Sequence, residues 1–218
     1  MKVVILAGGL GTRISEYTKT IPKPMIPINN VPILIHIINH YKKYNFKEFY
    51  IAVGYKSNVI KNYFKNNKIK NCKINLINTG QNTMTGGRLK RLRDFIGKET
   101  FMLSYGDGLS NVDIHKLYES HKKSGCSATV TAVRPQARFG EILLENNLVK
   151  SFKEKPQLNT GYINGGFFIF SSKIFEYIKS DETILEKEPL ELLASNGELN
   201  AYRHEGFWQC MDTKRDHQ

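Results

Sequence analysis

The chain has 218 residues, of which 40% are hydrophobic and 24% charged, and its formal net charge is +12. This length suits one well-buried domain, and the composition is ordinary for a soluble globular protein. Crossing a bilayer takes an apolar run of roughly 18 residues, and the chain has none, so we expect no membrane partner. The three cysteines are odd in number and lie far apart, which suits a reducing cytoplasm; they are Cys72, Cys126 and Cys210.

The positive charge alone would favour a nucleic-acid partner, because clustered lysines and arginines neutralise phosphates. Here the basic residues are scattered, with only modest groups at 61–73 and 88–93. Basic residues also serve small phosphorylated ligands, so we expect no nucleic-acid partner.

The first two-thirds of the chain alternates predicted strands and helices. Residues 3–7 form a continuous apolar run, typical of a strand buried on both faces of a parallel sheet. A short signal peptide is the alternative, but we expect a first strand, because the apolar run is short and glycines and Arg13 follow directly. Further strands are predicted at 49–53, 73–78, 101–105 and 128–133, and helices at 32–44, 58–64, 87–95 and about 114–121. This order predicts a doubly wound, Rossmann-like α/β fold: a mixed, mainly parallel sheet with helices on both faces.

The C-terminal third is richer in predicted strands. Residues 142–152 read as a hairpin turning at Asn146-Asn147, and 165–170 as an apolar strand. Helices are expected near 172–178 and 188–195, with a last strand or pair of strands at 200–209. With no linker or repeat in view, we expect one domain over residues 1–218.

A glycine-rich segment follows the first strand: Gly8, Gly9, Leu10, Gly11, Thr12 and Arg13. Glycines let the backbone approach a ligand and present N–H groups to an anion, and an arginine adds donors suited to phosphate. The segment matches neither the dinucleotide fingerprint nor the P-loop. It predicts a phosphate-binding loop, and the alternative is a flexible turn.

Lys23 stands between Pro22 and Pro24. Two prolines restrict the backbone on both sides of the lysine. A cation held rigidly near a phosphate loop can stabilise the charge that grows during phosphoryl transfer. Taken alone, the segment would indicate an ordinary surface lysine.

Asp107 lies between two glycines directly after the predicted strand 101–105. Ligands of open α/β sheets bind beyond the carboxyl ends of strands, so Asp107 and the glycine segment should share one crevice. A carboxylate there is a natural Mg²⁺ ligand beside phosphates, and Asp212 is the best candidate for a second one. Lys155 and Asn164 could line an acceptor pocket, or could equally belong to edge turns.

All these segments in this order resemble the sugar-phosphate nucleotidyltransferase family. The resemblance rests on Leu6–Arg13, Pro22–Met25, Asn82–Arg91, Tyr105–Gly108, Glu154–Pro156, Tyr162–Phe167 and Gly206–Thr213. It implies that residues 1–135 bind the nucleotide and 136–218 the acceptor. The implied nucleotide contacts are Leu6, Ala7, Gly8, Gly9, Gly11, Thr12, Arg13, Lys23, Thr83, Arg88 and Gly106.

The resemblance also implies the roles of the remaining residues. Arg13 and Lys23 would be catalytic, and Asp107 and Asp212 would hold Mg²⁺. The acceptor would meet Lys155, Asn164 and Gly165. In the family chemistry, an acceptor phosphate oxygen attacks the α-phosphorus of a nucleoside triphosphate and pyrophosphate leaves, with no general base required.

The stretch 85–91 resembles the cytidylyltransferases of this family, so CTP is the expected donor and a sugar 1-phosphate, first of all glucose 1-phosphate, the expected acceptor. The alternatives are UTP, dTTP or GTP as donor, a non-glucose phosphate as acceptor, or a catalytically silent regulatory subunit. The chain is shorter between Phe64 and Asn78 than those relatives, which leaves the acceptor and a homo-oligomeric state open. Family members usually supply polysaccharide synthesis.

Overall fold

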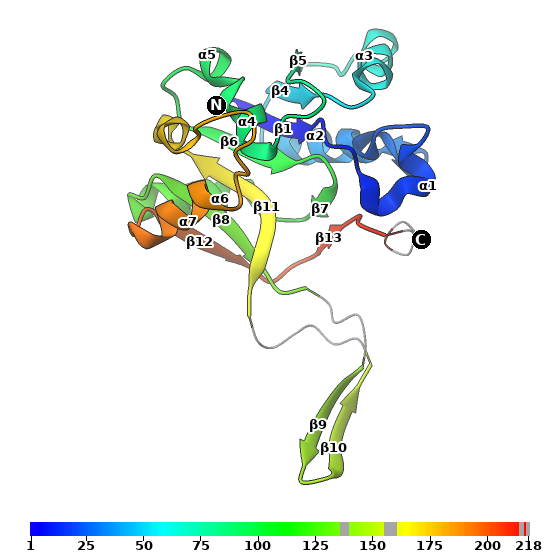
Figure 1. The fold of residues 1–218 in the computed structure, drawn as a ribbon, viewed down its shortest axis with the longest axis vertical. Helices are drawn as coiled ribbons and strands as arrows, with labels where there is room; N and C mark the ends of the chain where they lie inside the picture. The colour runs from blue at the N-terminus through cyan, green and yellow to red at the C-terminus, as the bar shows by residue number, and fades with distance from the viewer. Residues whose placement is uncertain (136–139, 155–160, 214–215, 217–218) are drawn as a thin grey trace.

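A seven-stranded sheet forms the centre of the molecule (Figure 1). The computed structural model describes residues 1–135, 140–154, 161–213 and 216. From edge to edge the strands are β12 (Leu199–His204), β8 (Ala128–Val133), β11 (Ile163–Phe170), β6 (Phe101–Tyr105), β1 (Val3–Ala7), β4 (Glu48–Val53) and β5 (Lys73–Asn78). β11 runs antiparallel to β6 and β8, and all other neighbours pair in parallel. The predicted mixed, mainly parallel sheet is confirmed.

Helices cover both faces of this sheet, because β1 is apolar in both directions. Val3, Ile5 and Ala7 join one core cluster, together with residues of α2 (Ile33–Lys43), α3 (Ser57–Asn66) and α6 (Ile114–Ser124). Val4 and Leu6 join the other cluster. That second face is covered by α4 (Thr85–Lys90), α5 (Arg93–Ile96), the 3₁₀ helix η3 (Ser172–Tyr177) and α7 (Glu188–Ser195). The central strands are therefore buried on both faces, as a doubly wound fold requires.

The predicted helix over 87–95 is wrong in its extent. The structure has two short helices there, and the first, α4, begins at Thr85. The backbone N–H of Gly86 donates to the carbonyl of Thr183 over 2.9 Å, and a Cβ on Gly87 would lie 2.3 Å from the Asp181 carbonyl. The start of α4 is thus set by close docking against a distant loop, which a local pattern does not reveal.

Short elements around the carboxyl ends of the strands were not predicted. They are the 3₁₀ helices η1 (Thr12–Ile14) and η2 (Lys23–Met25), helix α1 (Ser15–Thr18), the strand pair β2 (Pro27–Ile28) and β3 (Val31–Pro32), and β7 (Gly108–Ser110). The prediction of a last strand or pair of strands over 200–209 is met by two strands, which join different sheets. β12 joins the central sheet, whereas β13 (Trp208–Cys210) turns back and pairs antiparallel with β7.

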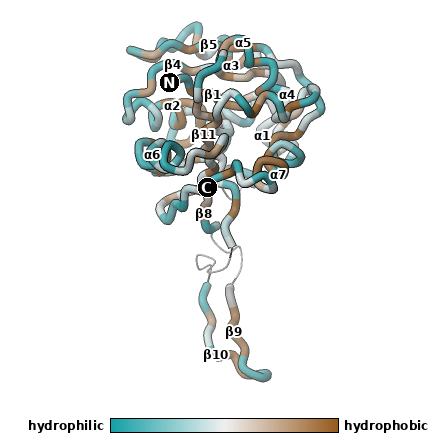
Figure 2. The backbone as a smooth tube through the Cα atoms, turned by 90° about the vertical axis from the view of Figure 1, so that its left-hand side faces the viewer, coloured by the Kyte–Doolittle hydropathy of each residue, from teal (hydrophilic) through white to brown (hydrophobic). Residues whose placement is uncertain are grey.

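The predicted hairpin is confirmed as β9 (Glu141–Glu145) and β10 (Leu148–Lys153), which project away from the body (Figures 1 and 2). Asn146 has a φ of 54°, the left-handed conformation that asparagine tolerates in a tight turn. Six large apolar side chains of the hairpin are exposed: Ile142, Leu143, Leu144, Leu148, Val149 and Phe152. Two other strands of the C-terminal third, β11 and β12, belong to the central sheet. Among the described residues, no helix is both long and apolar enough to span a membrane.

Candidate active site

The glycine segment after β1 is shaped by its neighbours as much as by any ligand. A Cβ on Gly8 would lie 2.3 Å from Nη1 of Arg88 and 2.9 Å from the backbone N of Gly54. Gly11 has a φ of 65°, and a Cβ there would lie 2.7 Å from Cγ2 of Thr18. Packing alone therefore requires glycine at both positions. An added Cβ on Gly9 would meet nothing within 4 Å, so Gly9 is the most open glycine of the segment.

Lys23, Asp107 and Asp212 converge on one point. The Nζ atom of Lys23 lies 2.6 Å from Oδ2 of Asp107 and 2.7 Å from Oδ1 of Asp212. The pairing of β7 with β13 brings the two aspartates together. The backbone N–H of Met211 extends this pairing by donating to the Asp107 carbonyl over 3.0 Å. The side chain of Lys23 is only 11% exposed. The proline-flanked lysine therefore points inward, towards the carboxylates.

The charges of this group reinforce one another. Burial acts to lower the pKa of Lys23, but the charge of Asp107 and hydrogen bonds to both aspartates outweigh it and raise that pKa above its ordinary value. For Asp212, burial acts to raise the pKa, and Lys23 and Arg13 more than offset it, so the pKa is lowered. Lys23 and Asp212 are therefore both charged at neutral pH.

Arg13 completes the charged group from the solvent side. Its Nη1 donates to Oδ2 of Asp212 over 2.5 Å, while its side chain is 76% exposed. An exposed guanidinium keeps most of its five N–H donors available. Arg13 can therefore reach a bound phosphate without breaking any buried contact.

Asp107, Cys210 and Asp212 offer three potential metal-ligating atoms that all lie within 4.8 Å of one another. Two carboxylates at this separation fit a hard divalent cation such as Mg²⁺, which takes one or two carboxylates and fills its other positions with water and phosphate oxygens. Burial, together with the two carboxylates, raises the pKa of the Cys210 thiol to about 12. A thiol this weakly acidic does not act as a nucleophile at neutral pH.

Arg88 forms part of the wall behind the glycine segment. Its side chain is buried, and Nη1 donates to the Gly80 carbonyl over 2.6 Å and to Oγ1 of Thr79 over 2.9 Å. Nη2 donates to the Gln81 carbonyl over 3.1 Å. Arg88 thus fixes the loop 79–81 against Gly8. Thr83, also buried, packs under the same loop, since its Oγ1 would lie 2.8 Å from a Cβ on Gly80.

Arg88→Leu is expected to lower the free energy of unfolding by about 2 to 4 kcal/mol, because it leaves buried carbonyls without donors. Urea unfolding measures this change. The matched control is Arg91→Leu, one turn further along, where an exposed pair with Asp181 is lost and little change is expected. If Arg88→Leu keeps wild-type stability but binds nucleotide poorly, the arginine contacts the nucleotide directly instead of holding the wall.

A second polar network lies at the carboxyl end of β6, around Tyr105. The Tyr105 hydroxyl donates to Oε1 of Glu186 over 2.6 Å and accepts from Nδ2 of Asn164 over 3.0 Å. Oγ1 of Thr85 donates to Oε2 of the same glutamate over 2.6 Å. Tyr105 and Glu186 were missed by the sequence analysis. The position of Tyr105 directly before Gly106-Asp107 was a usable signal for it, whereas Glu186 has no local signal.

The structure also places the other predicted residues. Gly106 packs tightly, because a Cβ there would lie 2.8 Å from the Leu6 carbonyl and 3.0 Å from Cγ of Pro24. Gly165 is buried against β8, and Trp208 donates its indole N–H to the Gly165 carbonyl over 2.7 Å. Thr12 is exposed, Leu6 and Ala7 are buried in β1, and Lys155 lies outside the described residues.

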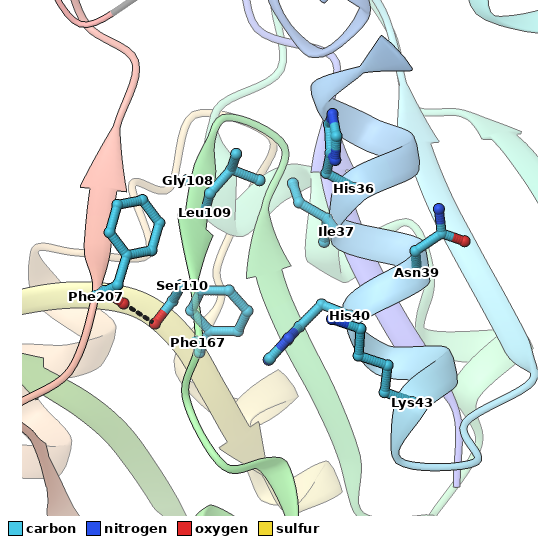
Figure 3. A pocket seen from close by; sticks show the side chains of 10 residues that line it. All are labelled: His36, Ile37, Asn39, His40, Lys43, Gly108, Leu109, Ser110, Phe167 and Phe207. Atoms are coloured by element: carbon cyan, nitrogen blue, oxygen red, sulfur yellow. Dashed lines mark hydrogen bonds between the residues drawn. The ribbon is translucent and has the colours of Figure 1, made fainter. Parts of the chain in front are cut away.

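A separate hollow of about 230 Å³ lies between α2 and β7, with Phe207 at its rim (Figure 3). His36 and His40 line it, and each hydrogen-bonds a backbone carbonyl, of Ile28 over 3.0 Å and of Val112 over 2.9 Å. Both histidines of α2 are thus tied to the backbone of neighbouring segments. The hollow contains none of the charged residues described above.

Residues 2–210 match the family model described as "Nucleotidyl transferase". The chain belongs to this family. The nucleotidyltransferase is 43% identical to a glucose-1-phosphate cytidylyltransferase of Salmonella typhi, over 99% of this chain and 93% of that protein. It is 37% identical to a D-glycero-alpha-D-manno-heptose 1-phosphate guanylyltransferase of Campylobacter jejuni subsp. jejuni, over 88% of this chain and 85% of that protein.

Solved structures of similar fold include HddC from Yersinia pseudotuberculosis complexed with GMP-PN. It superposes on the nucleotidyltransferase with a TM-score of 0.77 and 27% identity, covering 99% of this chain and 96% of that one. The resemblance predicted from the sequence motifs is confirmed, and with it the enzyme class.

Proposed function

We propose that this nucleotidyltransferase moves CMP from CTP to a sugar 1-phosphate, with glucose 1-phosphate as the first acceptor to test. The products are a CDP-sugar and pyrophosphate. The observation that carries the reaction type is the position of Lys23 between Asp107 and Asp212 beside the glycine segment. The choice of CTP is supported by relatives named glucose-1-phosphate cytidylyltransferases, two of them from Salmonella typhi and Salmonella typhimurium and each 43% identical over 99% of this chain.

In this proposal the chain's own residues act by positioning and by charge. Backbone N–H groups around Gly9 cradle the triphosphate, and Arg13 and Lys23 stabilise negative charge as pyrophosphate leaves. The acceptor phosphate is already ionised near neutral pH, so its oxygen attacks the α-phosphorus without a general base. Thr83 and Arg88 shape the wall on the nucleotide side, and Gly106 lets Pro24 approach the end of β1.

Mg²⁺ is the proposed cofactor, held by Asp107 and Asp212. Bound there, it would neutralise charge on the triphosphate during transfer. Lys23 bridges the same two carboxylates, so its ammonium would turn towards the phosphates if the carboxylates held the metal. One cation would then replace another beside the two carboxylates.

The acceptor is proposed to lie against Asn164, Tyr105 and Glu186. An amide, a phenol and a carboxylate provide both donors and acceptors, which suits the hydroxyl groups of a sugar. Lys155 is proposed to meet the acceptor phosphate, and Gly165 to leave room beside Asn164. A cytoplasmic location remains a prediction, in keeping with three free cysteines, and so does a homo-oligomeric state.

A panel of CTP, UTP, dTTP and GTP, each with glucose 1-phosphate and Mg²⁺, tests the donor by pyrophosphate release. We expect CTP to have the highest kcat/KM. A clear preference for GTP would favour the second candidate, a guanylyltransferase, for which the 37% identical heptose enzyme is the supporting relative.

The acceptor is tested with CTP and a set of sugar 1-phosphates. No turnover with any donor and acceptor, despite measurable nucleotide binding, would favour a catalytically silent regulatory subunit. The complete charged set of Arg13, Lys23, Asp107 and Asp212 argues against that alternative.

A further inference from the structure

Cys210 lies at the point where the two aspartates converge. It is the last residue of β13 and lies two residues before Asp212 in the sequence. Its partner across the strand pair is Gly108, which directly follows Asp107. Its Sγ belongs to the group in which all potential ligand atoms lie within 4.8 Å of one another. The reaction proposed above uses the two carboxylates and gives the thiol no task.

The chemistry of this donor set differs from that of a pure magnesium site. Mg²⁺ prefers oxygen ligands and has little affinity for sulfur. Zn²⁺, Co²⁺ and Cd²⁺ accept thiolate together with carboxylate oxygen, and three protein ligands with one open position are a common arrangement for Zn²⁺. Two aspartates and one cysteine therefore make a mixed set that a softer divalent cation can use in full.

We propose that Asp107, Cys210 and Asp212 form a three-ligand site for a thiophilic divalent cation, which competes with Mg²⁺ for the active site. The inference rests on the proposed metal site and extends it to a ligand that the reaction does not require. On binding, the thiol proton passes to solvent and a sulfur–metal bond forms, with no change of oxidation state. The Lys23 ammonium would then leave the carboxylates, as proposed above for Mg²⁺.

The other two cysteines provide matched controls. Cys126 is partly exposed, and its Sγ contacts the carbonyls of Ser124 and Gly197. Cys72 is also partly exposed, and its charged neighbours are Lys42 and Lys47. Neither belongs to a group of three potential metal ligands among the described residues.

The test is a titration of the full chain with Cd²⁺ under reducing conditions, without nucleotide, followed through the ultraviolet thiolate-to-Cd²⁺ charge-transfer band. We expect a band that saturates at one equivalent in the wild type and in the Cys72→Ser and Cys126→Ser variants. In Cys210→Ser the band should be absent, and excess Mg²⁺ should weaken it in the wild type. A band that persists in Cys210→Ser, or that Mg²⁺ does not affect, overturns the proposal.

Asp107→Asn keeps all three thiols and guards against misfolding of the cysteine variant. It should weaken Cd²⁺ binding at least about tenfold, because a full charge close to a divalent cation is removed. Unchanged affinity in Asp107→Asn would overturn the three-ligand site. The charge-transfer band is measured without turnover. A chain that shows the band but fails every nucleotide assay refutes the proposed function alone. An active chain without the band refutes this inference alone.

Discussion

Lys23→Met is expected to lower kcat by about 100- to 1,000-fold, the usual loss when one preorganised charge is removed from a transition state. The substituted side chain retains the length of the lysine stem and fills the same buried space beside Pro24. A large loss of kcat with little change in the KM for CTP would show that the ammonium acts mainly in the transition state. Steady-state pyrophosphate release at saturating Mg²⁺ measures both constants.

The same variant should reveal the cation exchange through its stability. Without the ammonium, Asp107 loses the cation beside it and faces Asp212, which keeps only the exposed Arg13, so the melting temperature should fall. Mg²⁺ should then raise it more in Lys23→Met than in the wild type, because the metal relieves that repulsion. Calorimetry with and without Mg²⁺ measures the difference.

The pH dependence of stability follows from the two pKa shifts. The Asp212 pKa is lowered by folding, so its contribution is present above the ordinary value of 3.8 and is lost as pH falls through the folded value. The Lys23 pKa is raised, so its contribution is present below 10.5 and is lost as pH rises through the folded value. In Lys23→Met the alkaline loss should disappear, and mild acid should stabilise the variant as a carboxylate takes up a proton.

Lys19→Met is the control, because Lys19 is exposed and lies just ahead of the proline-flanked lysine in the sequence. It should leave kcat and the response to Mg²⁺ unchanged. If Lys23→Met behaves like this control, the buried ion pairs are structural and the proposed role of Lys23 is wrong.

Asp107→Asn and Asp212→Asn should each reduce Mg²⁺-dependent turnover by about 1,000-fold, since a metal supplies several kcal/mol of charge stabilisation to phosphoryl transfer. Each variant should also need a higher Mg²⁺ concentration for half-maximal rate. Asp212→Asn should also raise the KM for CTP, because it weakens the ion pair that holds Arg13 in place. A Mg²⁺ titration at several CTP concentrations separates these effects.

Asp94→Asn is the matched control, because Asp94 is an exposed carboxylate on α5. It should have wild-type kinetics. Full activity in either Asp107→Asn or Asp212→Asn would mean that the paired carboxylates do not hold the catalytic metal.

The sequence by itself determined the elements whose signal is local. The apolar run of β1 identified a strand buried on both faces, and the boundaries of β5, β6, β8 and α7 agree with those predicted. The Asn146-Asn147 turn identified the projecting hairpin. The sequence also predicted roles for Lys23, because two prolines restrict its backbone, and for Asp107, because it directly follows the carboxyl end of a strand.

The tertiary structure alone decided which distant segments meet. Asp212 reaches Asp107 because β13 leaves the central sheet and pairs with β7, and the same pairing brings Cys210 to the site. Glu186 reaches Tyr105 from a loop before α7, and the guanidinium of Arg88 hydrogen-bonds the loop 79–81. Periodicity and turn chemistry report a residue's own neighbourhood, whereas the partner of a strand edge or a buried charge is set by the packing of the whole chain.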